Sequence, residues 1–323
     1  MFGNNKILGL ENRNQIGIVN IFFTIQGEGP FAGMPALFIR LGGCNLACKF
    51  CDTEFDEFEY MEINQIIDIC FEKMDASHKE DWDKIIKKHY LIVITGGEPF
   101  RQNISPLCNK LLSLGFNIQI ETNGLLWRAL DPRIHIVCSP KVILKNTKFM
   151  NQNITKHASI NEITEPKVAE PKVSEPNVVE SNVAESNSES NLEVNYQESL
   201  NKITEPKVSE SNSVINYQES FIYSKPHPEI LARAEGLKLL ISETHKGYTD
   251  IPIWLKERLD EKKLSESGKG KIYEKITNSD IFLQPMDEYD ALKNKANLDL
   301  AIKLASKYNL RLGIQMHKVI NVE

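Results

Sequence analysis

The sequence FIRLGGCNLACKFCDT at residues 38–53 joins a short apolar segment to three closely spaced cysteines. The apolar part predicts a β-strand over residues 36–41, and two glycines after it begin a loop. Cys44, Cys48 and Cys51 follow in this loop with the spacing C-x3-C-x2-C. Three thiolates at that spacing can close on one compact centre. We therefore expect a metal site directly after a strand.

The number of thiols restricts the kind of metal site. A structural zinc site usually has four protein ligands, and a ferredoxin cluster also uses four cysteines. The other cysteines, Cys70, Cys108 and Cys138, are isolated in apolar segments and are expected to be buried apolar side chains. Three thiolates on a [4Fe–4S] cluster would leave one iron open to a small molecule. A zinc site completed by a distant His is the alternative.

The segments around the cysteines alternate between strand and helix patterns. Helical spacing of apolar residues predicts helices over residues 62–74, 105–114 and 289–308. Runs rich in Val, Ile and Leu predict strands over residues 16–23, 36–41, 90–95, 117–122, 135–139, 236–241, 280–284 and 311–315. This alternation predicts an α/β fold with a mostly parallel sheet. Functional residues should gather at the carboxyl ends of its strands.

A segment of unusual composition interrupts this pattern. Residues 150–220 hold twelve Glu, five Lys and no Gly, Cys, Trp or Phe. Near-copies recur in it, such as ITEPKV at 163–168 and 203–208. Such a segment buries too little apolar surface to offset its ordering entropy. We therefore predict a disordered repeat insertion over residues 146–226, either without a role or acting as a docking tail, and a single domain formed by residues 1–145 plus 227–323.

Charge and composition exclude several classes of protein. The chain has a formal net charge of −6, but residues 150–220 carry −7 and the rest +1. Neither value favours binding to nucleic acid through bulk charge. No apolar run reaches the length of a membrane span, and no secretory signal is visible. Together with the sparse cysteines, this predicts a cytoplasmic protein that contacts neither membrane nor nucleic acid.

The cysteine spacing resembles that of the radical S-adenosylmethionine (SAM) superfamily. That resemblance implies a partial (β/α) TIM-like barrel, a [4Fe–4S] cluster on Cys44, Cys48 and Cys51, and SAM bound at the open iron. Further motifs at predicted strand ends agree with it: TGGEP at 95–99, ETNG at 121–124, SPK at 139–141 and QPMD at 284–287. The residues that this resemblance assigns to SAM are Phe50, Gly97, Glu98, Glu121, Asn123, Ser139, Pro140, Lys141, Gln284, Pro285, Met286 and Asp287.

A narrower resemblance covers nearly all of the chain outside the insertion. The motifs IQGEG at 25–29, CDT at 51–53 and QMHK at 315–318 are similar to those of the 7-carboxy-7-deazaguanine synthase family, lyases of 7-deazapurine and queuosine biosynthesis. The family implies conversion of 6-carboxy-5,6,7,8-tetrahydropterin to 7-carboxy-7-deazaguanine with loss of ammonia, by ring contraction that a 5′-deoxyadenosyl radical begins. It also implies Mg²⁺ with Thr53 as ligand, a reductant such as flavodoxin or ferredoxin, and a homodimer.

The same resemblance implies a set of substrate-binding residues. Arg40 suits the substrate carboxylate, since a guanidinium offers a planar fork of donors. His317 is expected to reach the site from the last strand. The complete set is Ile25, Gln26, Gly27, Glu28, Arg40, Thr95, Gln315, His317 and Glu323. The family commonly ends in proline, whereas Glu323 stands here.

Two alternatives remain at this stage. Another radical SAM enzyme, such as a glycyl-radical activase, would share the cysteines and GGEP but would not need IQGEG, CDT and QMHK together. A non-catalytic iron–sulfur or zinc-binding protein, including a degenerate former enzyme, would keep the thiolates without needing polar motifs at successive strand ends.

Overall fold

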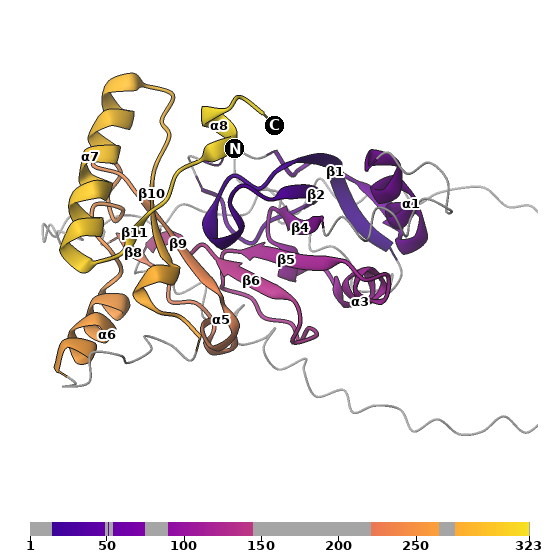
Figure 1. The fold of residues 1–323 in the computed structure, drawn as a ribbon, viewed down its shortest axis with the longest axis horizontal. Coiled ribbons are helices and arrows are strands. Elements are labelled where there is room, and N and C mark those ends of the chain that lie inside the picture. Colours follow the sequence, from indigo (N-terminus) through magenta and orange to yellow (C-terminus); the bar gives the residue numbers. More distant parts are fainter. Residues whose placement is uncertain are drawn as a thin grey trace, which may run out of the picture. The chain divides into compact units, whose positions relative to one another are not determined.

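The computed structural model describes residues 15–48, 51, 54–74, 90–144, 221–264 and 275–322. A nine-stranded sheet in the order β11-β10-β9-β6-β5-β4-β2-β1-β3 forms the centre of this part of the chain (Figure 1). Its strands are β1 (Gln15–Ile25), β2 (Pro35–Leu41), β3 (Glu59–Glu62), β4 (Leu91–Gly96), β5 (Asn117–Thr122), β6 (His135–Cys138), β9 (Gly236–Ile241), β10 (Ile281–Pro285) and β11 (Arg311–Leu312).

Most neighbouring strands run in the same direction. From β2 through β4, β5, β6, β9 and β10 to β11, each pairing is parallel. The strand β1 is antiparallel to β2, and β3 is antiparallel to β1. The predicted α/β fold with a mostly parallel sheet is therefore confirmed. Because the seven strands are parallel, their carboxyl ends meet at one edge of the sheet.

Helices lie along the outside of the curved sheet (Figure 1). They are α1 (Ile63–Lys73), α3 (Ser105–Ser113), α5 (Pro228–Arg233), α6 (Ile253–Leu264) and α7 (Ala291–Tyr308). The short α8 (Met316–Val319) lies between α7 and β1 in Figure 1, and the 3-10 turns are η1 (Gly29–Phe31), η3 (Pro99–Arg101) and η5 (Asn278–Asp280). Their ends follow local chemistry. The Asp290 side chain accepts from the amides of Leu292 and Lys293 at the start of α7, and Asn309 ends it in the left-handed conformation at φ 52°.

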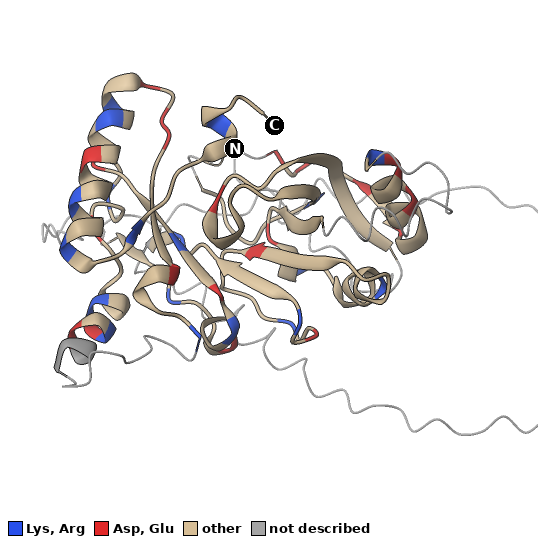
Figure 2. Ribbon diagram, viewed as in Figure 1, with Lys and Arg blue, Asp and Glu red and all other residues tan. Residues whose placement is uncertain are grey.

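The core consists of strand side chains and the inner faces of α1, α3, α5, α6 and α7. On α1, Ile66, Ile67, Cys70 and Phe71 are buried. Cys108 on α3 and Cys138 on β6 are also buried, so the prediction that these three isolated cysteines are apolar core residues is confirmed. Charged side chains gather on the helices and loops (Figure 2). Among the described helices, none is long and apolar enough to cross a membrane.

A two-stranded ribbon flanks the predicted insertion. In it, β7 (Val142–Leu144) pairs antiparallel with β8 (Phe221–Tyr223), and Leu144 is the register partner of Phe221. Residues 145–220 lie outside the described residues, so their predicted disorder stays a prediction, as does the division into domains. The last six residues of the predicted insertion are described and begin with β8. The two ends of the 145–220 segment are therefore adjacent in space.

The structure differs from expectation most clearly after α7. The strand predicted over residues 311–315 ends at Leu312 as β11. Beyond it the backbone amide of Met316 donates to the carbonyl of Gly27 at 2.9 Å, and α8 begins. The chain leaves the sheet because these contacts hold it against the segment after β1. His317 therefore lies on a short helix and not on the last strand, which corrects our expectation.

A buried glutamine joins β1 to the loops near the cysteines. Gln102 accepts from the Gly17 amide at 2.8 Å and donates to the carbonyls of Gly17 at 2.9 Å and Gly42 at 3.2 Å. It is 6% exposed, so few waters could replace these bonds. Its amide thus supplies hydrogen bonds at a β1 segment beside an irregularity in the β1–β2 register.

Replacing Gln102 with Met would remove these hydrogen bonds from the Gly17 amide and the Gly42 carbonyl, whereas the Gly17 carbonyl would keep the Gly42 amide as a donor. We expect the free energy of unfolding to fall by about 2–3 kcal/mol, because each unpaired buried group costs about 1–3 kcal/mol. Chemical denaturation measures the change, with the exposed neighbour Asn103→Ala as control. Equal stability of the two variants would contradict this assignment.

Candidate functional site

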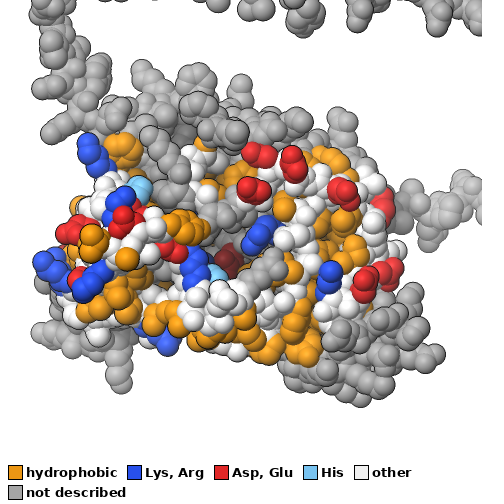
Figure 3. All heavy atoms as spheres, turned by 90° about the horizontal axis from the view of Figure 1, so that it is seen from above, with side chains coloured by type: hydrophobic (Ala, Val, Ile, Leu, Met, Phe, Trp, Pro, Cys, Tyr) orange, Lys and Arg blue, Asp and Glu red, His pale blue; other side chains and the backbone are white. Residues whose placement is uncertain are grey.

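A pocket of about 700 Å³ opens at the carboxyl ends of the parallel strands. Seen from above, the molecule is hollowed there, with Asp or Glu side-chain atoms inside the hollow and Lys, Arg and His side chains at its edge (Figure 3). The sequence-predicted residues that line it are Ile25, Gln26, Glu28, Arg40, Cys44, Cys48, Cys51, Thr95, Gly97, Glu121, Asn123, Ser139, Lys141, Gln284, Pro285, Met286, Asp287, Gln315 and His317. The structure thus brings most of the predicted set to one cavity.

Six predicted residues are not among those lining the pocket. Phe50, Thr53 and Glu323 lie outside the described residues. Gly27, Glu98 and Pro140 are described but do not line the pocket. The side chain of Glu98 in particular is fully buried in the protein interior.

The cysteine loop packs tightly against the glycines after β4. A Cβ atom on Gly97 would lie 2.0 Å from the carbonyl oxygen of Gly43, so only glycine allows this approach. The amides of Gly97 and Glu98 donate to the carbonyls of Leu41 and Gly43. The GGEP motif therefore has a packing role in addition to facing the pocket: it holds the loop that carries the three thiols.

Glu98 is fully buried and joins two strand ends. Its carboxylate accepts from the Thr122 hydroxyl at 2.7 Å and from the amides of Asn123 at 2.8 Å and Phe100 at 3.1 Å. Burial raises the pKa of Glu98 to about 7, although these hydrogen bonds favour the charged form. Both carboxylate oxygens thus have protein partners. The pocket is instead lined by Thr95, Gly96 and Gly97 of the motif.

A buried lysine lies between two glutamates in the pocket. We call these three residues, Glu28, Lys238 and Glu121, the pocket floor. Lys238 on β9 donates to Glu28 and, at 3.2 Å, to Glu121. Burial raises the pKa of Glu28, but the charge of Lys238 and its hydrogen bond, with Gln315 and His317, outweigh it and lower that pKa to about 2. Sequence analysis missed Lys238, although a lysine inside the apolar strand GLKLLI was a visible signal.

Aromatic side chains and Arg40 form another part of the wall. Phe22 and Phe38 stack with ring centroids 5.3 Å apart, and the Arg40 guanidinium lies 5.1 Å from the Phe22 centroid. No carboxylate pairs with Arg40 in the part of the chain that the structure describes. A guanidinium held on an aromatic surface can bind an anionic group of a ligand by donating hydrogen bonds to it.

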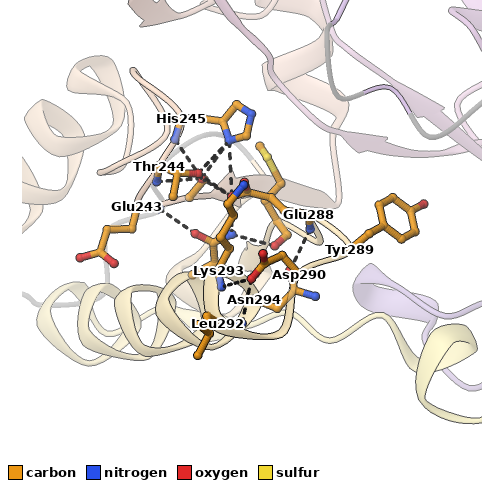
Figure 4. A network of polar contacts seen from close by, with 12 residues as sticks. Glu243, Thr244, His245, Glu288, Tyr289, Asp290, Leu292, Lys293 and Asn294 are labelled. Carbon is orange, nitrogen blue, oxygen red and sulfur yellow. Dashed lines mark hydrogen bonds and ion pairs between the residues drawn. The ribbon is translucent and has the colours of Figure 1, made fainter.

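A second acidic cluster fixes the loop after β10 (Figure 4). Glu288 accepts from the hydroxyls of Ser242 at 3.1 Å and Thr244 at 2.6 Å and from the Asn297 amide at 2.9 Å. His245 Nδ1 lies 3.5 Å from the same oxygen. These partners outweigh burial and lower the Glu288 pKa to about 2. The cluster anchors the segment carrying Gln284–Asp287, and neither His245 nor Glu288 belonged to a predicted motif.

The donor set fits a cluster with three protein ligands. The three thiols line one cavity, are not in disulfides, and come from a single loop. Burial raises the pKa of Cys44 to about 12 and also raises that of Cys48, so both need a cationic partner to become thiolates. Within the described residues, no three His, Cys, Asp or Glu side chains already surround one point at metal-binding distance.

Known proteins are similar to this chain over most or part of its length. No protein-family model matches the chain. It is 32% identical over 325 residues to the 7-carboxy-7-deazaguanine synthase of Rickettsia prowazekii, covering 100% of this chain and 96% of that protein. It is 41% identical over 146 residues to that of Rhodospirillum rubrum, covering 44% and 57%. A crystal structure of QueE from Escherichia coli aligns over 94% of this chain and 95% of that chain, with 20% identity and a TM-score of 0.49.

Replacing Gly27 with Ala tests the contact that places α8 over the pocket. The added Cβ would lie 2.1 Å from His317 Nδ1 and 2.9 Å from its backbone nitrogen. We expect α8 to loosen by about 1–3 kcal/mol, the usual cost of overpacking. Hydrogen exchange of residues 316–320 should accelerate accordingly. In a His317→Ala background the same substitution should have a smaller effect, and an equal effect would contradict a clash with the ring.

Proposed function

Because the chain belongs to the 7-carboxy-7-deazaguanine synthase family of radical SAM lyases, we propose that this pocket converts 6-carboxy-5,6,7,8-tetrahydropterin to 7-carboxy-7-deazaguanine with loss of ammonia. The observation that carries the proposal is the meeting of the three-cysteine loop, the polar strand ends and the Glu28–Lys238–Glu121 floor in one cavity. A non-catalytic metal-binding protein would not need such a floor. A glycyl-radical activase loses support because the full-length relative is a synthase.

The cofactors would occupy the side of the pocket nearest the cysteines. When bound, a [4Fe–4S] cluster and SAM supply the electron and the hydrogen-atom acceptor that begin the reaction. Cys44, Cys48 and Cys51 would hold the cluster. Gly97, Asn123, Ser139, Lys141 and residues 284–287 line the adjoining wall and would orient SAM. The Lys141 ammonium donates to the Ser139 hydroxyl at 2.8 Å, and its charge acts on the Cys48 thiol.

The substrate would occupy the side formed by β1, β2 and α8. Its ring carries N–H donors and carbonyl acceptors that need partners away from water, since an unpaired buried polar group costs about 1–3 kcal/mol. Glu28 and Glu121 of the floor offer such partners, and so does Gln26. Arg40, stacked on Phe22, would hold the substrate carboxylate. Thr95 on β4 would lie between SAM and the substrate, and His317 on α8 would contact the substrate.

Several finer features belong to the same proposal. Mg²⁺ prefers oxygen ligands, and Thr53, two residues beyond the last cysteine, would supply one. The family resemblance supports an electron donor such as flavodoxin or ferredoxin, a homodimer and a cytoplasmic location.

Anaerobic cluster reconstitution tests the proposed function. The protein, incubated with SAM, a reductant, Mg²⁺ and the carboxytetrahydropterin, should form the deazaguanine product, followed by mass spectrometry. Cys48→Ala should lose the cluster absorbance and product formation, because two thiolates cannot hold the cluster. Cys70→Ala on α1, away from the pocket, is the matched control and should keep both. Cluster formation and SAM cleavage without deazaguanine would contradict the substrate assignment.

A shortened chain tests whether the insertion takes part in the reaction. Because Leu144 and Phe221 are register partners, residues 145–220 can be replaced by a short glycine-containing turn. Closure entropy of a long loop grows only by about 0.6 kcal/mol per doubling of length, so the core should fold without it. We expect product formation within about twofold of the full chain. Loss of cluster binding or turnover would show that the segment has a role.

A further inference from the structure

Lys238 lies where a charged side chain is unexpected. It is the third residue of β9, between Leu237 and Leu239, which are fully buried, and its side chain is 9% exposed. It nevertheless lines the pocket. A lysine buried to this degree loses most of its hydration, and only paired charges compensate that cost.

The two carboxylates around Lys238 are held in matching ways. In each, Oε2 accepts from the lysine ammonium, and Oε1 accepts from two glutamine side chains. For Glu28 these are Gln284 at 3.0 Å and Gln315 at 2.8 Å. For Glu121 they are Gln26 at 3.0 Å and Gln119 at 2.9 Å. Both carboxylates are thus fixed in position by donors that favour their ionised form.

Mostly neutral side chains surround the trio of Glu28, Lys238 and Glu121 among the described residues. The segment after β1, the strands β5 and β10, and the segment before α8 present neutral glutamine amides to the carboxylates. His317 on α8 is the additional titratable group that lowers the pKa of Glu28. The ammonium is therefore the principal counter-charge of two carboxylates, and the trio has a net charge of −1.

We propose that Lys238 is a positioning residue whose ammonium keeps Glu28 and Glu121 both ionised and in place, so that both accept hydrogen bonds from N–H groups of a bound aminopyrimidinone ring. The assignment of that ring rests on the proposed function. Without the cation, two anions would share one desolvated floor, and one of them would take up a proton. A protonated carboxyl donates a hydrogen bond, so the pattern that the ring meets would change.

The pKa values agree in direction with this geometry. Burial alone would raise the pKa of Glu28 and lower that of Lys238. Instead the mutual charges and hydrogen bonds lower the pKa of Glu28 to about 2 and raise that of Lys238 above its ordinary value. Glu28 is therefore ionised at neutral pH.

Proton release on substrate binding distinguishes this role from a merely structural one. Cluster-loaded protein with SAM but no reductant would be titrated with the pterin substrate by anaerobic calorimetry, in two buffers of different ionisation enthalpy. Native protein should release no proton from this floor at pH 7. Lys238→Met should release up to about one proton and bind at least tenfold more weakly, with affinity recovering as pH rises.

Two further variants sharpen the test. Lys238→Arg keeps the charge, so it should retain the native proton balance even if its larger side chain weakens binding. Lys238→Met/Glu121→Gln leaves a single carboxylate and should also release no proton. With reductant present, KM should change more than kcat in Lys238→Met.

A pH-independent loss of affinity in Lys238→Met, with the proton balance of native protein, would overturn the proposal. Proton release by the double variant equal to that of Lys238→Met would overturn it as well. Native protein that neither binds the pterin nor forms product would instead count against the proposed function.

Discussion

One buried carboxylate holds three loops of the pocket together. Glu98 accepts hydrogen bonds from Thr122, Asn123 and Phe100, and thereby ties the end of β4 to the end of β5. The Asn123 side chain in turn donates to Asn45 in the cysteine loop at 2.7 Å. A parallel sheet brings strand ends to one edge but does not order the loops that follow them. That order comes from a shared acceptor, and burial makes its loss costly.

The fold could be read largely from the distribution of apolar residues. The predicted strands over 117–122 and 236–241 match β5 and β9 at both ends, because both segments are rich in Ile or Leu and most of their side chains are buried. Elements that depend on distant partners were missed. The polar strand β3 forms by pairing with β1, and β7 forms by pairing with β8, which follows 76 residues later in the chain. The local sequence of β3 or β7 does not show which distant strand it pairs with.

The sequence predicted the motif residues that line the pocket better than the residues that hold the pocket wall in place. Motif resemblance identified residues 139, 141 and 284–287, which do line the cavity. It could not tell that the Glu98 carboxylate turns inward, because that depends on amide donors of a neighbouring strand end. Lys238 and Glu288 lie outside the motifs, and their importance comes from partners far away in sequence. A charge inside an apolar strand was the available signal for Lys238.

The uneven burial of the three cysteines affects how the protein must be handled. Cys51 is exposed, whereas burial raises the pKa of the Cys44 and Cys48 thiols. Alkylating and oxidising reagents attack thiolates that they can reach. In protein purified without a metal centre, Cys51 would therefore be modified first, and a single modified sulfur removes one of three ligands. Modification of the Cys51 sulfur, rather than unfolding, would then limit how long such a sample can still bind a cluster.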